Sequence, residues 1–402
     1  MPLVSERGKN AIPSPIRFLA PYASAAEERG VKVHYMNIGQ PDIHTPVEAM
    51  DRVRNTNMEI LKYAPSAGID SYREKLVDYY RRFQINVVKE DILVTTGASE
   101  AISLVLNACL DPGDEVIVPE PFYANYLGYA HATGVQIKPI PTFIENSFAL
   151  PFITDFEPLI GPKTKAIFLC NPNNPTGGIY GQADLEALGQ LVKKHDLYLI
   201  VDEVYREFCY DEDFYSVLRL AGLENHTVVI DSISKRFSAC GARIGSIVSQ
   251  NELLIKACLT FAQLRLSAPG FGQLLGEATL DLPPAYLEDI CDEYNLRRCT
   301  LIDRLQKMQN VLCYLPKGAF YAFVRLPVPD TRKFCQWMLE SFNYNNETVM
   351  LAPGAGFYAT KGRGLDEVRI AYILNTGDIE KAMDCLEAGL EEYGGLVDLG
   401  QF

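Results

Sequence analysis

Residues 165–205, KAIFLCNPNNPTGGIYGQADLEALGQLVKKHDLYLIVDEVY, contain two short apolar runs on either side of an amphipathic segment. The runs that begin at 165 and 197 are nearly continuous in apolar residues, and 183–195 has apolar residues at helical spacing. A strand, a helix and a second strand of this kind are typical of a parallel sheet that helices cover on both faces. This stretch therefore predicts an α/β fold.

The same alternation continues through residues 70–250. Helices are predicted over 99–110 and 183–195. Seven strands are predicted, over 91–97, 114–121, 135–141, 165–175, 197–205, 227–234 and 242–249. We expect them to form a mostly parallel central sheet.

The alternation of apolar strands and amphipathic helices changes near residue 285. A helix is expected near 270–300, across this boundary. Beyond about residue 285 the chain has a long charged helical segment over 286–308 and separate strands over 318–326 and 368–374. A chain of 402 residues exceeds the size at which a single core stops growing. We predict a large domain over 46–284 and a smaller α+β domain that residues 1–45 and 285–402 form together.

Composition limits the partners. The formal net charge is −14 and no long run of Lys or Arg occurs, which argues against nucleic acids and anionic membranes. Residues 1–24 lack the apolar core of a secretory signal, and no apolar stretch has the length of a membrane span, so we expect a cytoplasmic protein. Ten cysteines lie singly, without metal-ligand spacing, so we expect no metal site.

Polar segments follow four of the predicted strands directly, at 96–100, 171–177, 202–205 and 232–235. In open α/β sheets, ligands bind at the carboxyl ends of the strands. We therefore expect these segments to converge on one crevice that binds a small molecule.

Each segment also has a purely structural interpretation. Asp202 could cap a following helix, and 171–178 could be only a turn, with a cis Asn-Pro bond. The segment 95–100 resembles an ordinary helix start. Lys235 could be a solvated lysine, as most lysines are.

The combination favours a chemical site. Burial at the edge of a crevice and the nearby positive charge of Arg243 both favour the neutral amine form of Lys235. The neutral amine is the form that reacts with aldehydes to give Schiff bases. Pyridoxal phosphate is such an aldehyde, and it needs a carboxylate at its ring nitrogen, donors to its phenolate oxygen and a phosphate cup. The candidates for these three tasks are, in turn, Asp202; Asn174 with Tyr205; and Ser232 with Arg243 and the helix start at 98–100.

Ten segments together resemble the class I/II pyridoxal phosphate-dependent aminotransferases of fold type I, most closely the prokaryotic aspartate aminotransferase subgroup. The similarity covers nearly the whole chain. The segments are NIGQPD (37–42), YAPSAGIDSYREKL (63–76), VTTGASEAI (94–102), VPEPFYANY (118–126), NPNNPTGG (171–178), VDEVY (201–205), SISKRFSACGARIG (232–245), GAFYAF (318–323), LAPGAGF (351–357) and VRIAYI (368–373).

The resemblance implies a role for each cofactor-binding residue. Lys235 would hold pyridoxal phosphate covalently and then act as general base and acid, and Asp202 would pair with the ring nitrogen. The remaining contacts would be Asn174 and the catalytic Tyr205 at the phenolate oxygen, Tyr123 on the ring face, and Ala98, Ser99, Ser232, Ser234 and Arg243 at the phosphate.

The resemblance also implies substrate and subunit contacts. Gly39, Asn174 and Arg369 would bind the substrate α-carboxylate, although Arg369 could instead be a surface arginine in a salt bridge. Tyr63 would reach the phosphate of a neighbouring subunit in a homodimer with shared active sites. Arg17, in the N-terminal arm, is the candidate cation for a distal carboxylate, with a solvated arginine as the alternative.

The implied activity is transfer of an amino group from an L-amino acid, with an aspartate-like donor preferred, to a 2-oxo acid such as 2-oxoglutarate, in a ping-pong reaction. Ser99 stands where the similar enzymes often carry a substrate-binding lysine, and Ala242 stands where many carry tryptophan. Two alternatives stay open: an aminotransferase for neutral or aromatic amino acids, and a β-lyase or synthase that uses the same cofactor.

Overall fold

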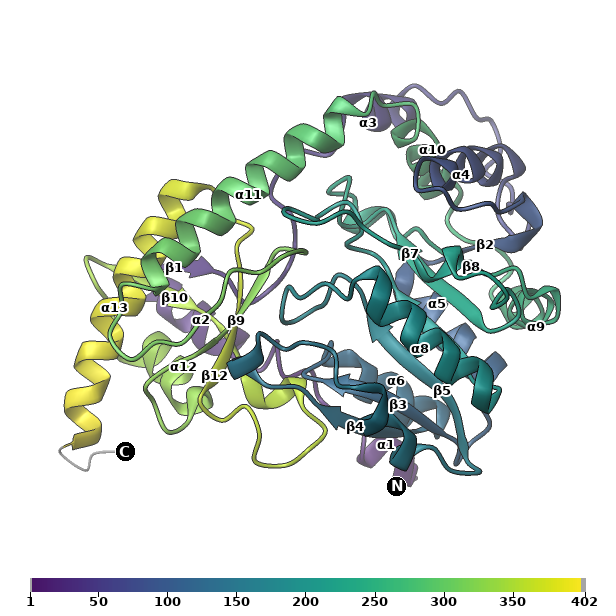
Figure 1. Cartoon of the computed structure of the whole chain (residues 1–402). Helices are drawn as coiled ribbons and strands as arrows, with labels where there is room; N and C mark the ends of the chain where they lie inside the picture. The colour runs from purple at the N-terminus through teal and green to yellow at the C-terminus, as the bar shows by residue number, and fades with distance from the viewer. Residues whose placement is uncertain (1, 399–402) are drawn as a thin grey trace.

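The structure, a computed structural model, describes residues 2–398, with side chains described through residue 395. A seven-stranded sheet with the order β2-β8-β7-β6-β5-β3-β4 lies at its centre (Figure 1). Its strands are β2 (Ile92–Thr95), β3 (Glu115–Glu120), β4 (Gln136–Pro141), β5 (Thr164–Cys170), β6 (Tyr198–Asp202), β7 (Thr227–Ser232) and β8 (Gly245–Val248). All seven strands predicted from the sequence are therefore confirmed.

One strand runs against the others. β3, β4, β5, β6 and β7 pair in parallel, whereas β8 is antiparallel to both β7 and β2. A parallel neighbour usually needs a crossover that contains an α-helix, but the 233–244 connection between β7 and β8 contains none. The short connection therefore reverses the chain direction, and the sheet is mostly parallel.

Helices cover both faces of the sheet. Alternate residues of β6 enter different cores: Leu199 and Val201 pack on one face and Ile200 packs on the other. The first core includes residues of α3 (Val47–Arg54), α4 (Asp70–Arg82), α7 (Ile153–Phe156), α8 (Gln182–His195) and α10 (Gly270–Thr279). The second core includes residues of α5 (Gly97–Cys109), α6 (Asn125–Thr133) and α9 (Glu252–Gln263). Burial on both faces explains the nearly continuous apolar strands.

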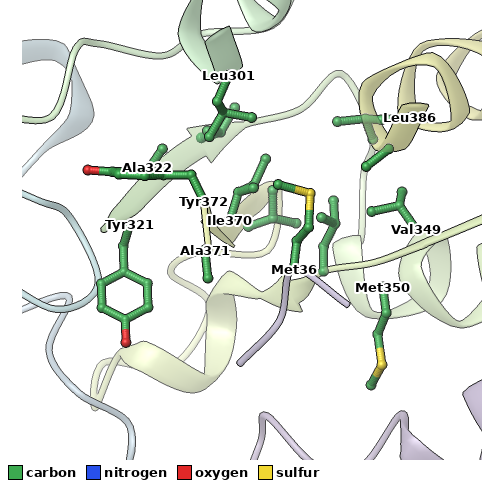
Figure 2. Packing of buried hydrophobic residues seen from close by; sticks show 14 of the residues in the cluster. Met36, Leu301, Tyr321, Ala322, Val349, Met350, Ile370, Ala371, Tyr372 and Leu386 are labelled. Atoms are coloured by element: carbon green, nitrogen blue, oxygen red, sulfur yellow. The ribbon is translucent and has the colours of Figure 1, made fainter. Parts of the chain in front are cut away.

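A third core lies to one side of the sheet, and Figure 2 shows its centre around Met36, Tyr321 and Tyr372. β1 pairs in parallel with β10, so the N-terminal segment joins the C-terminal part of the chain. The strands are β1 (Lys32–Tyr35), β9 (Tyr321–Arg325), β10 (Glu347–Met350), β11 (Ala352–Pro353) and β12 (Glu367–Ala371). The helices of this region are α2 (Ala20–Glu28), α11 (Ala285–Leu305), α12 (Thr331–Glu340) and α13 (Thr376–Asp398), and the short α1 (Glu6–Lys9) precedes them in the chain.

The helix expected near 270–300 is in fact two helices. α10 ends at Thr279, and α11 begins at Ala285, directly after Pro283 and Pro284. Proline has no backbone N–H to continue a helix but is tolerated at its start. α10 packs on α3 and α4, whereas α11 packs on α13 (Figure 1). The division into 46–284 and 1–45 with 285–402 stays a prediction.

The described residues contain neither a membrane-spanning helix nor a cluster of metal ligands. None of the described helices combines the length and the apolar character that crossing a bilayer requires. The described residues also contain no cluster of His, Cys, Asp and Glu suited to a metal ion. The cytoplasmic location stays a prediction.

Candidate active site

A cavity of about 500 Å³ opens where the carboxyl ends of β5, β6 and β7 face the third core. It is lined by every predicted site residue except Tyr63: Arg17, Gly39, Ala98, Ser99, Tyr123, Asn174, Asp202, Tyr205, Ser232, Ser234, Lys235, Arg243 and Arg369. The convergence expected from the strand ends is therefore confirmed, and residues from both ends of the chain complete the cavity.

Asp202 is the last residue of β6 and is buried. The Tyr126 hydroxyl donates to its Oδ2 at 2.9 Å, and the Val204 N–H donates to its Oδ1 at 3.4 Å. A turn and not a helix follows β6 directly, so the helix-cap interpretation of Asp202 is wrong. Burial raises the pKa of Asp202 to about 6, against the effect of the Tyr126 hydrogen bond. None of the described residues forms a salt bridge with Asp202, which lines the cavity.

Lys235 lies on the turn that follows β7. Its side chain is partly buried, and its Nζ donates to the Gly39 carbonyl oxygen at 2.7 Å. The interpretation as a solvated lysine is therefore wrong. Three residues before it, the Ser232 hydroxyl lies 2.8 Å from Ser234 Oγ and 2.8 Å from the Ile244 carbonyl, which fixes the start of the turn.

The N-terminus of α5 and Arg243 form one corner of the cavity. Glu100 accepts from the Thr96 N–H at 2.7 Å, but the Thr96 side chain does not cap the first turn of α5. A β-carbon at Gly97 would lie only 2.5 Å from Arg243 Nη2, and Gly97 has a φ of +74°. Glycine therefore lets the guanidinium lie directly against the first helical turn. Uncapped helical N–H groups and a guanidinium make an anion-binding corner.

Asn174 and Arg369 join the central sheet to the third core. Arg369, on β12, is buried, and its Nη1 donates to Asn174 Oδ1 at 2.9 Å. None of the described carboxylates forms a salt bridge with Arg369, so the surface salt-bridge interpretation is wrong. On its other side, the Asn174 amide lies 3.4 Å from the Tyr205 hydroxyl. Burial raises the pKa of Tyr205 well above its ordinary value, so its phenol is a hydrogen-bond donor at neutral pH.

The turn that carries Asn174 is built by its own asparagines. Asn171 Oδ1 accepts from the Tyr180 N–H at 2.9 Å, and Asn173 Oδ1 accepts from the Thr176 N–H at 3.1 Å. The Asn-Pro bonds at 171–172 and 174–175 are both cis. The segment is therefore a turn, as its composition predicts, and it also supplies one side chain to the cavity.

Two predicted residues lie at the margins of this site. Arg17 lines the cavity, and no described carboxylate forms a salt bridge with it. Tyr63 lies outside the cavity, with 79% of its surface exposed, beside Leu61 and Thr96. The structure of one chain therefore does not bring Tyr63 into its own cavity, and its role across a subunit interface stays a prediction.

Two tyrosines and one asparagine at or beside the cavity were not predicted from the sequence. Tyr321 lies on β9, and its hydroxyl is 2.9 Å from the Tyr205 hydroxyl. Tyr126 holds Asp202, as described above, and Asn125 donates to the Tyr123 hydroxyl at 2.7 Å. All three lie inside segments that carry the family resemblance, at 118–126 and 318–323, which was the only signal that could have identified them.

A family model described as aminotransferase class I and II matches residues 31–386. These residues include the whole central sheet and most of the third core. The chain belongs to this aminotransferase family. Arg17 lies outside the matched residues of the aminotransferase.

Relatives and solved structures agree with this membership. The aspartate aminotransferase of Pyrococcus horikoshii is 31% identical to this aminotransferase over 385 residues, which cover 94% of this chain and 95% of that protein. The aromatic-amino-acid aminotransferase 2 of Thermococcus litoralis is 30% identical over 400 residues, which cover 97% and 98% of the two chains. A single mutant of the Thermus thermophilus aspartate aminotransferase has a TM-score of 0.89 at 30% identity, covering 97% of this chain and 100% of that chain.

These comparisons confirm the fold type I prediction and the prediction of a transaminase. A β-lyase or synthase is not favoured, because the relatives have aminotransferase names. Pyridoxal phosphate is typical of this family. The cavity of this aminotransferase fits that group, because it offers a buried carboxylate without a cationic partner, a lysine amine and an anion-binding corner.

Proposed function

We propose that this aminotransferase transfers the amino group of a dicarboxylic L-amino acid to a 2-oxo acid, with pyridoxal phosphate bound at Lys235. The observation that carries the proposal is the cavity itself, in which Lys235, Asp202 and Arg369 lie together with Arg17. A lysine amine, a buried carboxylate and two arginines are the groups that a transaminase acting on a dicarboxylate requires.

Five groups of the cavity would hold the cofactor in addition to Lys235. Asp202 would bind its ring nitrogen, and Asn174 with Tyr205 would donate to its phenolate oxygen. Arg243 and the first turn of α5 would hold the phosphate. When bound, pyridoxal phosphate supplies an electron sink for the bonds to the substrate Cα.

The remaining groups act on the substrate. Arg369 would bind the α-carboxylate through its planar guanidinium, which orients the Cα–H bond toward Lys235. Once the amino group of the substrate has displaced Lys235 from the cofactor, the freed Lys235 Nζ would remove the Cα proton as general base and return a proton as general acid. Amino donor and oxo acceptor would use the same groups in turn, which gives ping-pong kinetics.

Selectivity for the substrate side chain would depend on Arg17. With serine at position 99, Ser99 offers no positive charge to a distal carboxylate, and Arg17 is a cation that lines the cavity without a described carboxylate partner. The relatives named aspartate aminotransferase make aspartate the first donor to test. Glutamate is the other dicarboxylic donor of the same chemistry.

The proposed function is tested by measuring both products for aspartate, alanine and phenylalanine with 2-oxoglutarate as acceptor. We expect glutamate and oxaloacetate to appear in equal amounts, with the highest kcat/KM for aspartate. Release of ammonia and pyruvate from cystathionine, without glutamate formation, would instead identify a β-lyase.

Replacing Arg17 with alanine should lower kcat/KM for aspartate and glutamate and spare alanine. Losing a charge partner of a distal carboxylate costs about 2 to 5 kcal/mol of selectivity. The matched control is Arg7→Ala, because Arg7 lies in the same N-terminal segment but bonds to the Ala132 carbonyl away from the cavity. An equal loss of kcat/KM for the dicarboxylates and for alanine would show that Arg17 does not bind the side-chain carboxylate of the substrate.

The homodimer with shared active sites is part of the same proposal. Tyr63 and its sequence neighbours Ile60 and Leu61 are apolar or aromatic and largely exposed in the single chain. Exposed apolar side chains that lie close together mark interaction surfaces. A second copy on this face would cover them and bring the partner's phenol toward the phosphate corner beside Thr96.

Mixing Tyr63→Ala and Lys235→Ala subunits should restore activity that neither variant has alone. Each hybrid dimer contains one site with an intact lysine and an intact partner tyrosine, so random mixing of equal amounts should give about a quarter of the wild-type activity. Tyr344→Ala is the control, because Tyr344 is also exposed but lies beside β10. If hybrids form, as native mass spectrometry can verify, and no activity returns, the sites are not shared.

A further inference from the structure

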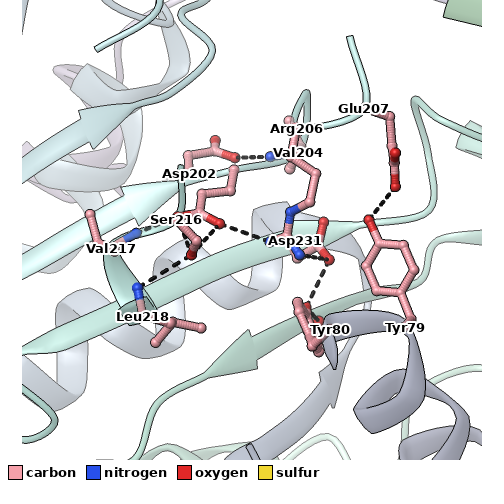
Figure 3. A network of polar contacts seen from close by, with 12 residues as sticks. Tyr79, Tyr80, Asp202, Val204, Arg206, Glu207, Ser216, Val217, Leu218 and Asp231 are labelled. Atoms are coloured by element: carbon pink, nitrogen blue, oxygen red, sulfur yellow. Dashed lines mark hydrogen bonds and ion pairs between the residues drawn. The ribbon is translucent and has the colours of Figure 1, made fainter. Parts of the chain in front are cut away.

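The two turns that carry Asp202 and Lys235 have a second set of side chains that do not enter the cavity. Glu203 and Arg206 follow Asp202, and Asp231 and Arg236 flank the Ser232–Lys235 turn. All four are fully buried, and none of the four lines the cavity. Instead they form one network, which Figure 3 shows around Arg206 and Asp231.

Asp231 is the centre of this network. Arg236 donates to both of its carboxylate oxygens, at 2.8 and 3.1 Å. The Tyr80 hydroxyl donates to Oδ2 at 2.8 Å, and the Ser232 N–H donates to Oδ1 at 2.7 Å. Asp231 therefore holds the first backbone group of the Lys235 turn and, through Arg236, the residue that directly follows Lys235.

Arg206 connects this turn to the turn that carries Asp202. Its Nη2 donates to Glu203 Oε2 at 3.0 Å, and its Nη1 lies 3.7 Å from Asp231 Oδ2. Glu203 also accepts from the Ser216 hydroxyl at 2.9 Å and from the Val217 N–H at 3.2 Å. The network thus joins the carboxyl ends of β6 and β7 on the side away from the cavity.

The charges of the network are tightly coupled. Burial would raise the pKa of Asp231, but the charges of Arg206 and Arg236 outweigh burial and hold that pKa at about 2. The two guanidinium groups also lie over aromatic rings, Arg236 at 4.5 Å from the centre of Tyr79 and Arg206 at 4.8 Å from that of Tyr80. Each charged group is therefore fixed from several directions.

A network of this kind is poorly explained by stability alone. Each charged group that is removed from water costs several kcal/mol of folding free energy. Apolar side chains of similar size in the same place often give an equal or greater stability. Directional hydrogen bonds, in contrast, fix the relative position of the groups that they join. Here the joined groups are the two turns that place Lys235 and Asp202.

We propose that Asp231, Arg206 and Arg236 are positioning residues that fix the separation of Lys235 and Asp202. They act only through those two turns, since none of the three lines the cavity. The inference rests on the proposed function, in which Lys235 and Asp202 hold opposite ends of one cofactor ring system. A shift of about 1 Å in one turn would misplace the amine relative to the ring and can cost about 10²-fold in rate.

The test uses Arg236→Met, which keeps side-chain length and apolar stem but removes the two bonds to Asp231. We expect kcat to fall about 10- to 100-fold with KM for the amino donor nearly unchanged. We also expect slower borohydride fixation of pyridoxal phosphate on Lys235, and a shifted pH midpoint in the absorbance titration of the bound cofactor. Arg236→Lys, which keeps the charge, should restore part of each loss.

The matched control is Arg298→Met. Arg298 is equally buried and bonds to Asp211 and the Pro316 carbonyl, but it does not line the cavity or contact either turn. It should lose thermal stability and keep the wild-type absorbance midpoint and fixation rate. The proposal is overturned if folded Arg236→Met, or Arg236→Lys where the methionine variant does not fold, has the wild-type midpoint and fixation rate.

Failure of the positioning inference can be distinguished from failure of the proposed function. If wild-type protein forms no adduct at Lys235 with pyridoxal phosphate, the proposed function is wrong, and the positioning inference is wrong with it. If wild-type protein forms the adduct and the Arg236 variants match it, only the positioning inference is wrong.

Discussion

Replacing Lys235 with alanine is expected to lower kcat for transamination by about 10⁴-fold or more and to leave the fold intact. General base and acid catalysis by a positioned side chain contributes about 10² to 10⁴ in rate, and Lys235 has an additional covalent role in the proposed reaction. Its Nζ donates one hydrogen bond, to the Gly39 carbonyl, so few native contacts are lost. The measurement is single-turnover conversion of aspartate, with circular dichroism as the check on folding.

Lys333→Ala is the control for this variant, because Lys333 is exposed on α12 and does not line the cavity. Borohydride reduction followed by peptide mass spectrometry should place the cofactor on Lys235 in the wild-type protein and in the control. If the Lys235→Ala protein still fixes the cofactor on another lysine, Lys235 is not the residue that binds the cofactor.

The central sheet could be predicted because its strands are buried on both faces. β5 and β6 contain apolar residues at most of their positions, and β7 contains the apolar run 228–230, a pattern that is typical of strands buried on both faces. The break between α10 and α11 was not predicted, although Pro283 and Pro284 mark it.

The candidate site could be predicted where its residues follow strands directly. Asp202 and Lys235 are placed by β6 and β7, so their convergence follows from the parallel pairing of those strands. Tyr321 could not be placed in this way, because its contact with Tyr205 joins residues 116 positions apart. The same holds for Tyr80 and Asp231, 151 positions apart. Neither apolar periodicity nor a local motif encodes such contacts.

Asp202→Asn is expected to lower kcat by about 10² to 10⁴-fold while the protein still binds the cofactor. A carboxylate stabilises a protonated ring nitrogen, which withdraws electrons from the substrate Cα, and a neutral amide does not. The amide has nearly the same shape, and Tyr126 can donate to its oxygen as it donates to Asp202 at 2.9 Å. The loss should therefore appear in proton abstraction from Cα, measured with α-deuterated aspartate.

The pH dependence of cofactor binding gives a second measurement on the same variant. Burial raises the pKa of Asp202 to about 6, so in the cofactor-free protein the carboxyl group is mostly neutral below pH 6 and ionised above it. Only the ionised form attracts a cationic ring nitrogen, so affinity should fall as the pH drops through 6. Titration of the cofactor itself affects both proteins alike, and the difference between wild type and Asp202→Asn isolates Asp202.

That difference should be largest at pH 8 and should shrink steadily toward pH 5. Asp211→Asn is the control, because Asp211 is an exposed carboxylate that pairs with Arg298 far from the cavity. Its binding curve should match the wild type at every pH. If Asp202→Asn also matches the wild type in both affinity and proton abstraction, the buried carboxylate at the end of β6 has only a structural role, and another group must hold the ring nitrogen.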